Sequence, residues 1–162
     1  MDKLIDTYNA VVGGIIALLS AVLGQHWILF VIFLIFNVID WLTGWMKSRM
    51  MHKENSAAGL KGILKKLGYW LMIAVAFAAG AVFVEIGNVL DINLKVTTML
   101  GWFVLASLTI NELRSICENF IEAGFTVPEI FVKGLQVADE AINNHTAAND
   151  TDIDKDDTQK KI

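Results

Sequence analysis

The sequence predicts an all-α integral membrane protein, a bundle of three to four transmembrane helices followed by a cytoplasmic amphipathic helical hairpin. Of the 162 residues, 55% are hydrophobic and only 19% are charged, and the mean hydropathy is +0.53. The apolar residues run together in blocks that leave no polar face, whereas a surface helix of a soluble protein keeps one. The basic residues gather between two of these blocks. Lipid is therefore the environment that this sequence favours.

Four apolar stretches are candidate transmembrane helices, at about residues 4–24, 27–46, 67–90 and 96–113. A span needs about 20 residues to cross about 30 Å of hydrocarbon, and the second and third stretches reach this length. In the first stretch, residues 10–24 alone are too short for a span, and their extension backwards takes in Asp6 and Asn9. Its helix therefore either crosses the membrane or lies on the membrane surface, so three and four spans both stay open.

Only Gly24, Gln25 and His26 separate the first two stretches. Residues 11–46 are too long for a single span, so the helix must break within them. Gln25 and His26 are the polar pair that can supply this break. We expect a tight hairpin at the level of the lipid head groups.

A basic interval at residues 47–66 orients the chain, because it holds six lysines and arginines against one acid, Glu54. Loops rich in lysine and arginine stay on the cytoplasmic side of the membrane. With four spans, both termini are then cytoplasmic and residues 91–95 form an external turn. With three spans, the N-terminus lies outside. The basic residues of this cytoplasmic loop are Lys47, Arg49, Lys53, Lys61, Lys65 and Lys66.

Beyond the fourth stretch the pattern becomes amphipathic, and residues 114–142 are predicted to form two juxtamembrane helices. Gly124 is expected to cap the first of them, and Pro128 lies where the second can begin. Their apolar stripes contain Leu113, Ile116, Phe120 and Ala123, and then Phe131, Leu135, Ala138 and Ile142. We expect this hairpin to lie against the inner face of the membrane. Residues 143–162 are poor in large apolar side chains and are predicted to be a disordered acidic tail.

Two segments carry a distinctive order of residues. The first is FNVIDWLTGWMKSR followed by ENSAAGLKGILKKLGYW, and the second is ELRSICENFIEAGFTVPE. In this order and spacing the chain resembles the phage-lysis and toxin-secretion holin family over roughly residues 30–135. The positions that match in the first segment are Asp40, Gly44, Gly59, Gly62, Lys65 and Lys66. Those that match in the second are Glu112, Ser115, Glu118, Asn119, Gly124 and Pro128.

The resemblance implies a holin that forms a homo-oligomer in the bacterial cytoplasmic membrane and opens lesions that release an endolysin or a toxin. Its partners would be other copies of itself and the lipid bilayer, and its coupling to the endolysin or toxin needs no direct binding. Two alternatives stay open. One is a membrane scaffold or accessory protein that leaves the bilayer intact, and the other is a small ion or solute channel.

One face of the second stretch is polar or small, since Asn37, Asp40, Gly44 and Ser48 recur at helical spacing. Such a face suits a helix interface or a water-filled lumen between copies. Asp40 is either a packing residue near a helix end or part of the assembly or the lesion wall. Either Lys65 or Lys66 can pair with it if their helices are neighbours.

Two further features are candidates for assembly. Glu85 is predicted to be a separate acidic site near the external face, with Lys95 as its closer partner. In the first stretch, Gly13, Ala17, Ser20 and Gly24 form a stripe of small residues. Such stripes let membrane helices approach closely, although glycine and alanine are also common in membrane helices by chance.

The sequence predicts no enzyme, no cofactor, no metal site and no binding of nucleic acid. The three histidines, His26, His52 and His145, lie in separate segments and have no partner at i, i+4. The single cysteine, Cys117, excludes an intrachain disulfide and a thiolate metal cluster. The basic residues are explained by membrane topology.

Overall fold

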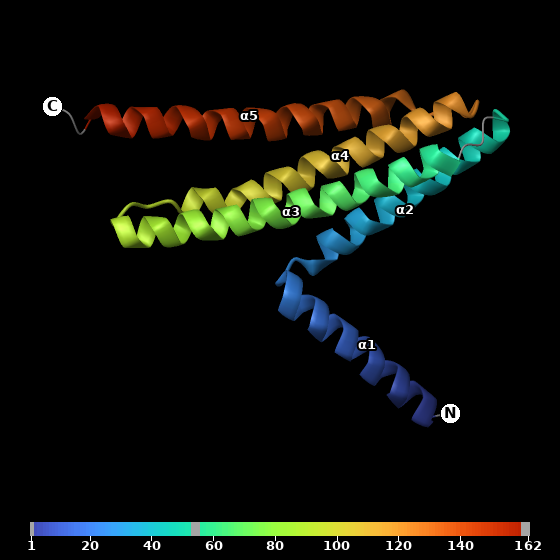
Figure 1. The fold of residues 1–162 in the computed structure, drawn as a ribbon, viewed down its shortest axis with the longest axis horizontal. Coiled ribbons are helices and arrows are strands. Elements are labelled where there is room, and N and C mark those ends of the chain that lie inside the picture. The colour runs from blue at the N-terminus through green and yellow to red at the C-terminus, as the bar shows by residue number, and fades with distance from the viewer. Residues whose placement is uncertain (1, 53–55, 160–162) are drawn as a thin grey trace. The chain divides into compact units, whose positions relative to one another are not determined.

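The computed structural model describes residues 2–52 and 56–159, and the described residues hold helices and no strand. The helices are α1 (Asp2–Leu23), α2 (Trp27–Met50), α3 (Ser56–Leu90), the 3-10 helix η1 (Lys95–Thr98), α4 (Met99–Glu122) and α5 (Glu129–Gln159), as drawn in Figure 1. This confirms the all-α class. The chain divides into two units, Met1–Ile35 and Phe36–Ile162.

Among the described residues, three helical segments are long and apolar enough to cross a membrane: Trp27–Met50, Gly59–Leu90 and Lys95–Glu122. They contain the second, third and fourth predicted stretches but run beyond them at the polar ends. The fourth helix continues past residue 113 because neither glycine nor proline interrupts residues 110–122. Charged residues such as lysine and glutamate also have a high helix propensity, comparable to that of apolar residues, so a helix does not end where the polar residues begin. The choice between three and four spans stays a prediction.

In the first unit, α1 ends at Leu23 and α2 begins at Trp27, so the predicted break at residues 24–26 is present. Gly24 has a φ of +75°, which the lack of a Cβ allows, and its carbonyl accepts a hydrogen bond from Trp27 N at 3.2 Å. The tight hairpin expected at the level of the lipid head groups stays a prediction.

In the second unit, α3 and α4 lie side by side and are joined by a short turn and η1 (Figure 1). Glycine lets them approach closely, because a Cβ added to Gly101 would overlap the ring of Phe77. A Cβ added to Gly80 would lie 2.6 Å from the carbonyl oxygen of Thr97, whose hydroxyl donates to the Gly80 carbonyl at 3.2 Å. Phe77 and Trp102 complete the contact edge to face, with ring centroids 5.0 Å apart.

The sequence predicts a helix cap at Gly124, and the turn between α4 and α5 has the form of a Schellman motif there. Gly124 has a φ of +88° and donates to the carbonyl of Ile121 at 3.0 Å, and Phe125 donates to that of Phe120 at 2.9 Å. The rings of Phe120 and Phe125 pack edge to face, 5.8 Å apart. The next helix begins directly after Pro128, as predicted. The position of residues 114–142 at the inner membrane face stays a prediction.

Helix α5 runs beside α4 (Figure 1), and Arg114 binds Asp139 across the two helices at 2.7 Å. Of its predicted apolar stripe, Leu135 is buried, Ile142 is half-buried, and Phe131 and Ala138 are exposed. The helix continues into the segment predicted to be a disordered tail, up to Gln159. Neither glycine nor proline follows Gly134 to interrupt it. Disorder of the tail stays a prediction, and its last three residues, 160–162, lie outside the described residues.

Replacing Gly80 by alanine is expected to lower the free energy of unfolding by about 1–3 kcal/mol, because the backbone of η1 must move to admit the new Cβ. Gly68, also in α3, is the matched control, since a Cβ added there meets nothing within 4 Å. Its replacement by alanine should leave stability unchanged or slightly raised. Helix content measured by circular dichroism during SDS titration in mild detergent gives both values. Equal effects at the two glycines would contradict the close approach of α3 and η1.

Candidate functional site, a buried polar cluster

The buried face of α4 carries polar residues where apolar ones are expected. Leu105, Glu112 and Asn119 recur every seven residues, which is close to two helical turns, so their side chains point the same way. Leu105 is 4% exposed, Glu112 2% and Asn119 6%. The predicted stripe at the end of this helix, from Leu113 to Ala123, is only half-buried. The inward face is therefore apolar at Leu105 and polar toward the end of the helix.

The part of α2 that belongs to the second unit also turns its polar face inward. Asn37 and Thr43 are buried, and Asp40 and Gly44 are half-buried. Its exposed side chains are large and apolar: Val38, Trp41, Leu42 and Trp45. A helix in water would show the reverse arrangement, whereas in lipid the polar groups must find partners inside the protein.

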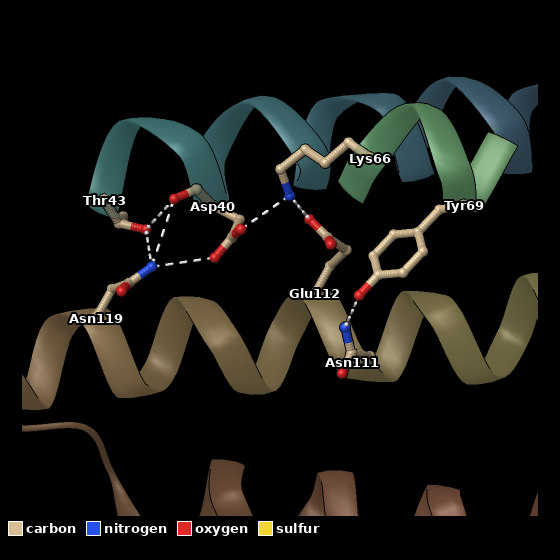
Figure 2. Close-up of polar contacts among 7 residues, drawn as sticks. All are labelled: Asp40, Thr43, Lys66, Tyr69, Asn111, Glu112 and Asn119. Atoms are coloured by element: carbon tan, nitrogen blue, oxygen red, sulfur yellow. Dashed lines mark hydrogen bonds and ion pairs between the residues drawn. The ribbon is translucent and has the colours of Figure 1, made fainter. Parts of the chain in front are cut away.

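Lys66 of α3 connects acids on two other helices (Figure 2). Its ammonium donates a hydrogen bond to Asp40 Oδ2 of α2 at 2.8 Å and another to Glu112 Oε2 of α4. The side chain of Lys66 is 15% exposed and that of Asp40 is 16% exposed, so both ion pairs are largely shielded from solvent. One cation thus joins three helices.

Asn119 joins α4 directly to α2 (Figure 2). Its Nδ2 donates to Asp40 Oδ1 at 3.0 Å and lies 3.2 Å from Thr43 Oγ1, which in turn donates to the Asp40 carbonyl at 3.0 Å. A Cβ on Gly44 would lie 3.5 Å from the same amide nitrogen, at ordinary van der Waals distance. We call Asp40, Thr43, Lys66, Glu112 and Asn119 the polar cluster.

Weaker contacts surround the polar cluster. Asn111 of α4 donates to the hydroxyl of Tyr69 of α3 at 2.9 Å, as Figure 2 also shows. The Lys65 ammonium lies 5.5 Å from the centre of the Tyr69 ring, within range of a cation–π interaction. Near the end of α2, Lys47 pairs with Glu122 at 3.2 Å, but Glu122 is more than half exposed. Exposed pairs of this kind contribute about 0–1 kcal/mol, so the buried cluster dominates the polar attachment of α2.

The charges of the polar cluster do not balance when both acids are ionised, because two carboxylates face one ammonium. Asp40 accepts hydrogen bonds at both carboxylate oxygens, from Lys66 and from Asn119. Charges buried in this way are stabilised only when they are paired and hydrogen-bonded. Lys66 is the counter-charge of both acids.

Within the described ranges, no group of three or more His, Cys, Asp or Glu side chains is placed to hold a metal ion.

The structure brings some of the predicted site residues together. Lys66, rather than Lys65, pairs with Asp40. Asn37 is buried one turn away on the same helix as Asp40 and Gly44. Glu85 is separate, since it is exposed on α3 and accepts a hydrogen bond from Asn88 at 3.3 Å instead of pairing with Lys95.

The other predicted residues lie outside the polar cluster. In the stripe of α1, Gly13, Ala17 and Gly24 are exposed and Ser20 is half-buried. In the basic interval, Arg49 lies over the Trp45 ring at 5.3 Å and Lys61 is exposed, while Lys53 falls outside the described residues. The roles of these residues in assembly and topology stay predictions.

Sequence reasoning missed that Thr43, Glu112 and Asn119 belong with Asp40. In the sequence, Glu112 and Asn119 stand out only as positions of the holin resemblance. The predicted apolar stripe of this segment begins at the next residue, Leu113, and so points to a different face of the helix. The signal that could have found them is their seven-residue spacing from Leu105, which puts both on the inward face of α4. A polar residue at such a position needs a partner on another helix.

Replacing Lys66 by methionine is expected to lower the free energy of unfolding by about 3–5 kcal/mol, because two buried carboxylates then face each other without a counter-charge. Adding Asp40→Asn and Glu112→Gln should restore most of this loss, since no buried charge remains. Lys61→Met, at an exposed lysine of the same helix, is the control and should change little. SDS titration of the purified variants compares them. A triple variant as unstable as Lys66→Met alone would refute this account of the cluster.

The sequence of this chain is similar to a known protein family and to individual bacterial and phage proteins. Residues 17–140 match the model of the bacteriophage holin family. An uncharacterised protein of Listeria innocua is 28% identical over 141 residues, 87% of this chain and 93% of the relative. An uncharacterised protein of Halalkalibacterium halodurans is 28% identical over 137 residues, 85% and 95% of the two chains.

A probable holin of Bacillus phage phi105 is 28% identical over 117 residues, 72% of this chain and 78% of the phage protein. No solved structure matches the chain. The family match includes α2, α3, α4 and the start of α5, and thus every residue of the polar cluster. The chain belongs to the bacteriophage holin family.

Proposed function

We propose that this protein is a holin that oligomerises in the bacterial cytoplasmic membrane and forms lesions through which an endolysin or a toxin leaves the cell. The observation that carries the proposal is the match to the bacteriophage holin family over most of the chain, including the polar cluster. A relative of similar sequence is itself described as a probable holin. The cargo crosses the lesion without needing to bind the protein.

The polar cluster gives the proposal a physical basis. Helices that expose only apolar surface cannot line a water-filled opening, because water must solvate the wall. Here Asp40, Lys66 and Glu112 lie within helices that are long and apolar enough to span a bilayer. A charged side chain at the bilayer centre costs about 2.5–3.5 kcal/mol on insertion scales. Groups retained at that cost are expected to serve assembly or the lesion wall.

The topology belongs to the same proposal. The basic residues between α2 and α3 would hold that connection on the cytoplasmic side, and the end of α4, the turn at Gly124 and the start of α5 would then lie near the cytoplasmic face as well. Self-association would use the small-residue stripe of α1 from Gly13 to Gly24 and the polar face of α2, with Asn37, Asp40 and Gly44. Glu85 would lie near the opposite face of the membrane.

Induced expression in bacteria together with a cytoplasmic wall hydrolase tests the function. A holin is expected to collapse the membrane potential abruptly and to release the hydrolase, so that the culture lyses. A scaffold or accessory protein would leave both the potential and the hydrolase in place. A small channel would abolish the potential but retain the hydrolase. Retention of the hydrolase by cells whose membranes contain the protein would therefore overturn the proposal.

Asp40→Asn is expected to change the onset of lysis or the size of the lesion while membrane insertion stays normal. The reason is that the substitution removes the charge that Lys66 and Asn119 hold in α2. Asp91→Asn is the control, since Asp91 is an exposed acid at a positive φ that asparagine also tolerates. Optical density after induction and fractionation of the membranes give the two readouts. Unchanged lysis in Asp40→Asn would make Asp40 a packing residue only.

A further inference from the structure

The second unit contains two kinds of helix contact. Helices α3 and α4 meet through glycine and apolar surfaces, with Gly101 against Phe77 and with Ile73 and Leu105 buried. The adjoining part of α2 buries polar groups instead, and it meets α3 and α4 through hydrogen bonds and ion pairs. The hairpin of α3 and α4 is thus held by close packing, and α2 is held to it by polar bonds.

These two kinds of contact respond differently to water. A polar contact can exchange its protein partners for water, because water offers donors and acceptors to the same groups and solvates their charges. Tightly packed apolar surfaces lose their close contacts without replacement when they separate. If water enters between the helices, α2 is therefore the element that leaves first.

The paired acids on Lys66 make this separation possible. Glu112 and Lys66 both belong to the α3–α4 hairpin, whereas Asp40 belongs to α2. When α2 leaves, Lys66 keeps Glu112 as its counter-charge, so the hairpin retains a neutral ion pair instead of an isolated ammonium. Asp40 and Thr43 lose their hydrogen bonds with Asn119, and all three side chains become available to water.

We propose that the contact of Asp40 and Thr43 with Lys66 and Asn119 is a latch that keeps each copy closed, and that lesions form when α2 leaves the α3–α4 hairpin. Glu112 is a positioning residue that holds Lys66 on the hairpin and so allows Asp40 to be released. After release, Asp40, Thr43 and Asn119 line the water-filled opening. This proposal rests on the proposed holin function, and in it the latch regulates when the lesions form.

The latch predicts opposite effects for the two acids. Asp40→Asn removes the charge that α2 offers to Lys66, so the latch weakens and lysis starts earlier than in the wild type. Glu112→Gln leaves Asp40 as the sole counter-charge of Lys66, so α2 is held more tightly and lysis starts later. Lysis times at matched amounts of membrane-inserted protein measure both. Shifts in the same direction, or no shift in either variant, would overturn the latch.

A cross-link across the contact tests the separation directly. Thr43 Oγ1 and Asn119 Nδ2 lie 3.2 Å apart, so cysteines at these two positions are within reach of a short bifunctional thiol reagent such as dibromobimane. The buried native thiol is first removed by Cys117→Ala, which also provides the parent. The parent and the two single-cysteine variants, Thr43→Cys and Asn119→Cys, are the controls. The reagent is added to cells after insertion and before the onset of lysis.

Loss of lysis in the cross-linked double-cysteine variant, with normal lysis in the treated controls, is the expected result. Lysis on time by cross-linked monomers would overturn the latch, as would cross-links that join two copies instead of lying within one. Failure of the inserted, untreated parent to release the hydrolase would instead count against the proposed function. The two proposals therefore fail on different measurements.

Discussion

The polar cluster depends on the two ion pairs of Lys66. Its ammonium binds Asp40 of α2 and Glu112 of α4, and so joins these two helices to α3. In a low-dielectric surrounding an unpaired charge is costly, so each of these residues constrains the position of the other two. The amide of Asn119 further fixes the orientation of α2 against α4, because it donates hydrogen bonds to both the carboxylate of Asp40 and the hydroxyl of Thr43.

The surrounding solvent explains why the polar groups lie inside. In the second unit, α2 exposes Trp41, Leu42 and Trp45 and turns Asp40 and Thr43 inward. Lipid cannot satisfy hydrogen bonds, so polar side chains of a spanning helix gather against protein or water. In a holin the same side chains would serve two states, paired with one another in the closed chain and hydrated in the lesion wall. Membership of the holin family makes this second state the natural subject of experiment.

Glycine packing provides the fixed part of the structure. Gly80 and Gly101 allow α3, η1 and α4 to approach so closely that a methyl group would not fit at either position. Such contacts favour one arrangement of the hairpin and oppose its separation. In this respect it differs from α2, which hydrogen bonds and ion pairs hold to the hairpin.

The sequence by itself determined the helical class, the positions of the apolar helices, the break at Gly24, the cap at Gly124 and the helix start after Pro128. These features depend on local composition and backbone preference, which nearby residues decide. The sequence also offered Asp40 a lysine partner but left Lys65 and Lys66 equivalent. Only the tertiary structure selected Lys66 as that partner and placed Glu112 and Asn119 on the face of α4 that meets α2. Those outcomes depend on which helix faces meet across 46 and 79 residues of chain, and local periodicity does not fix that.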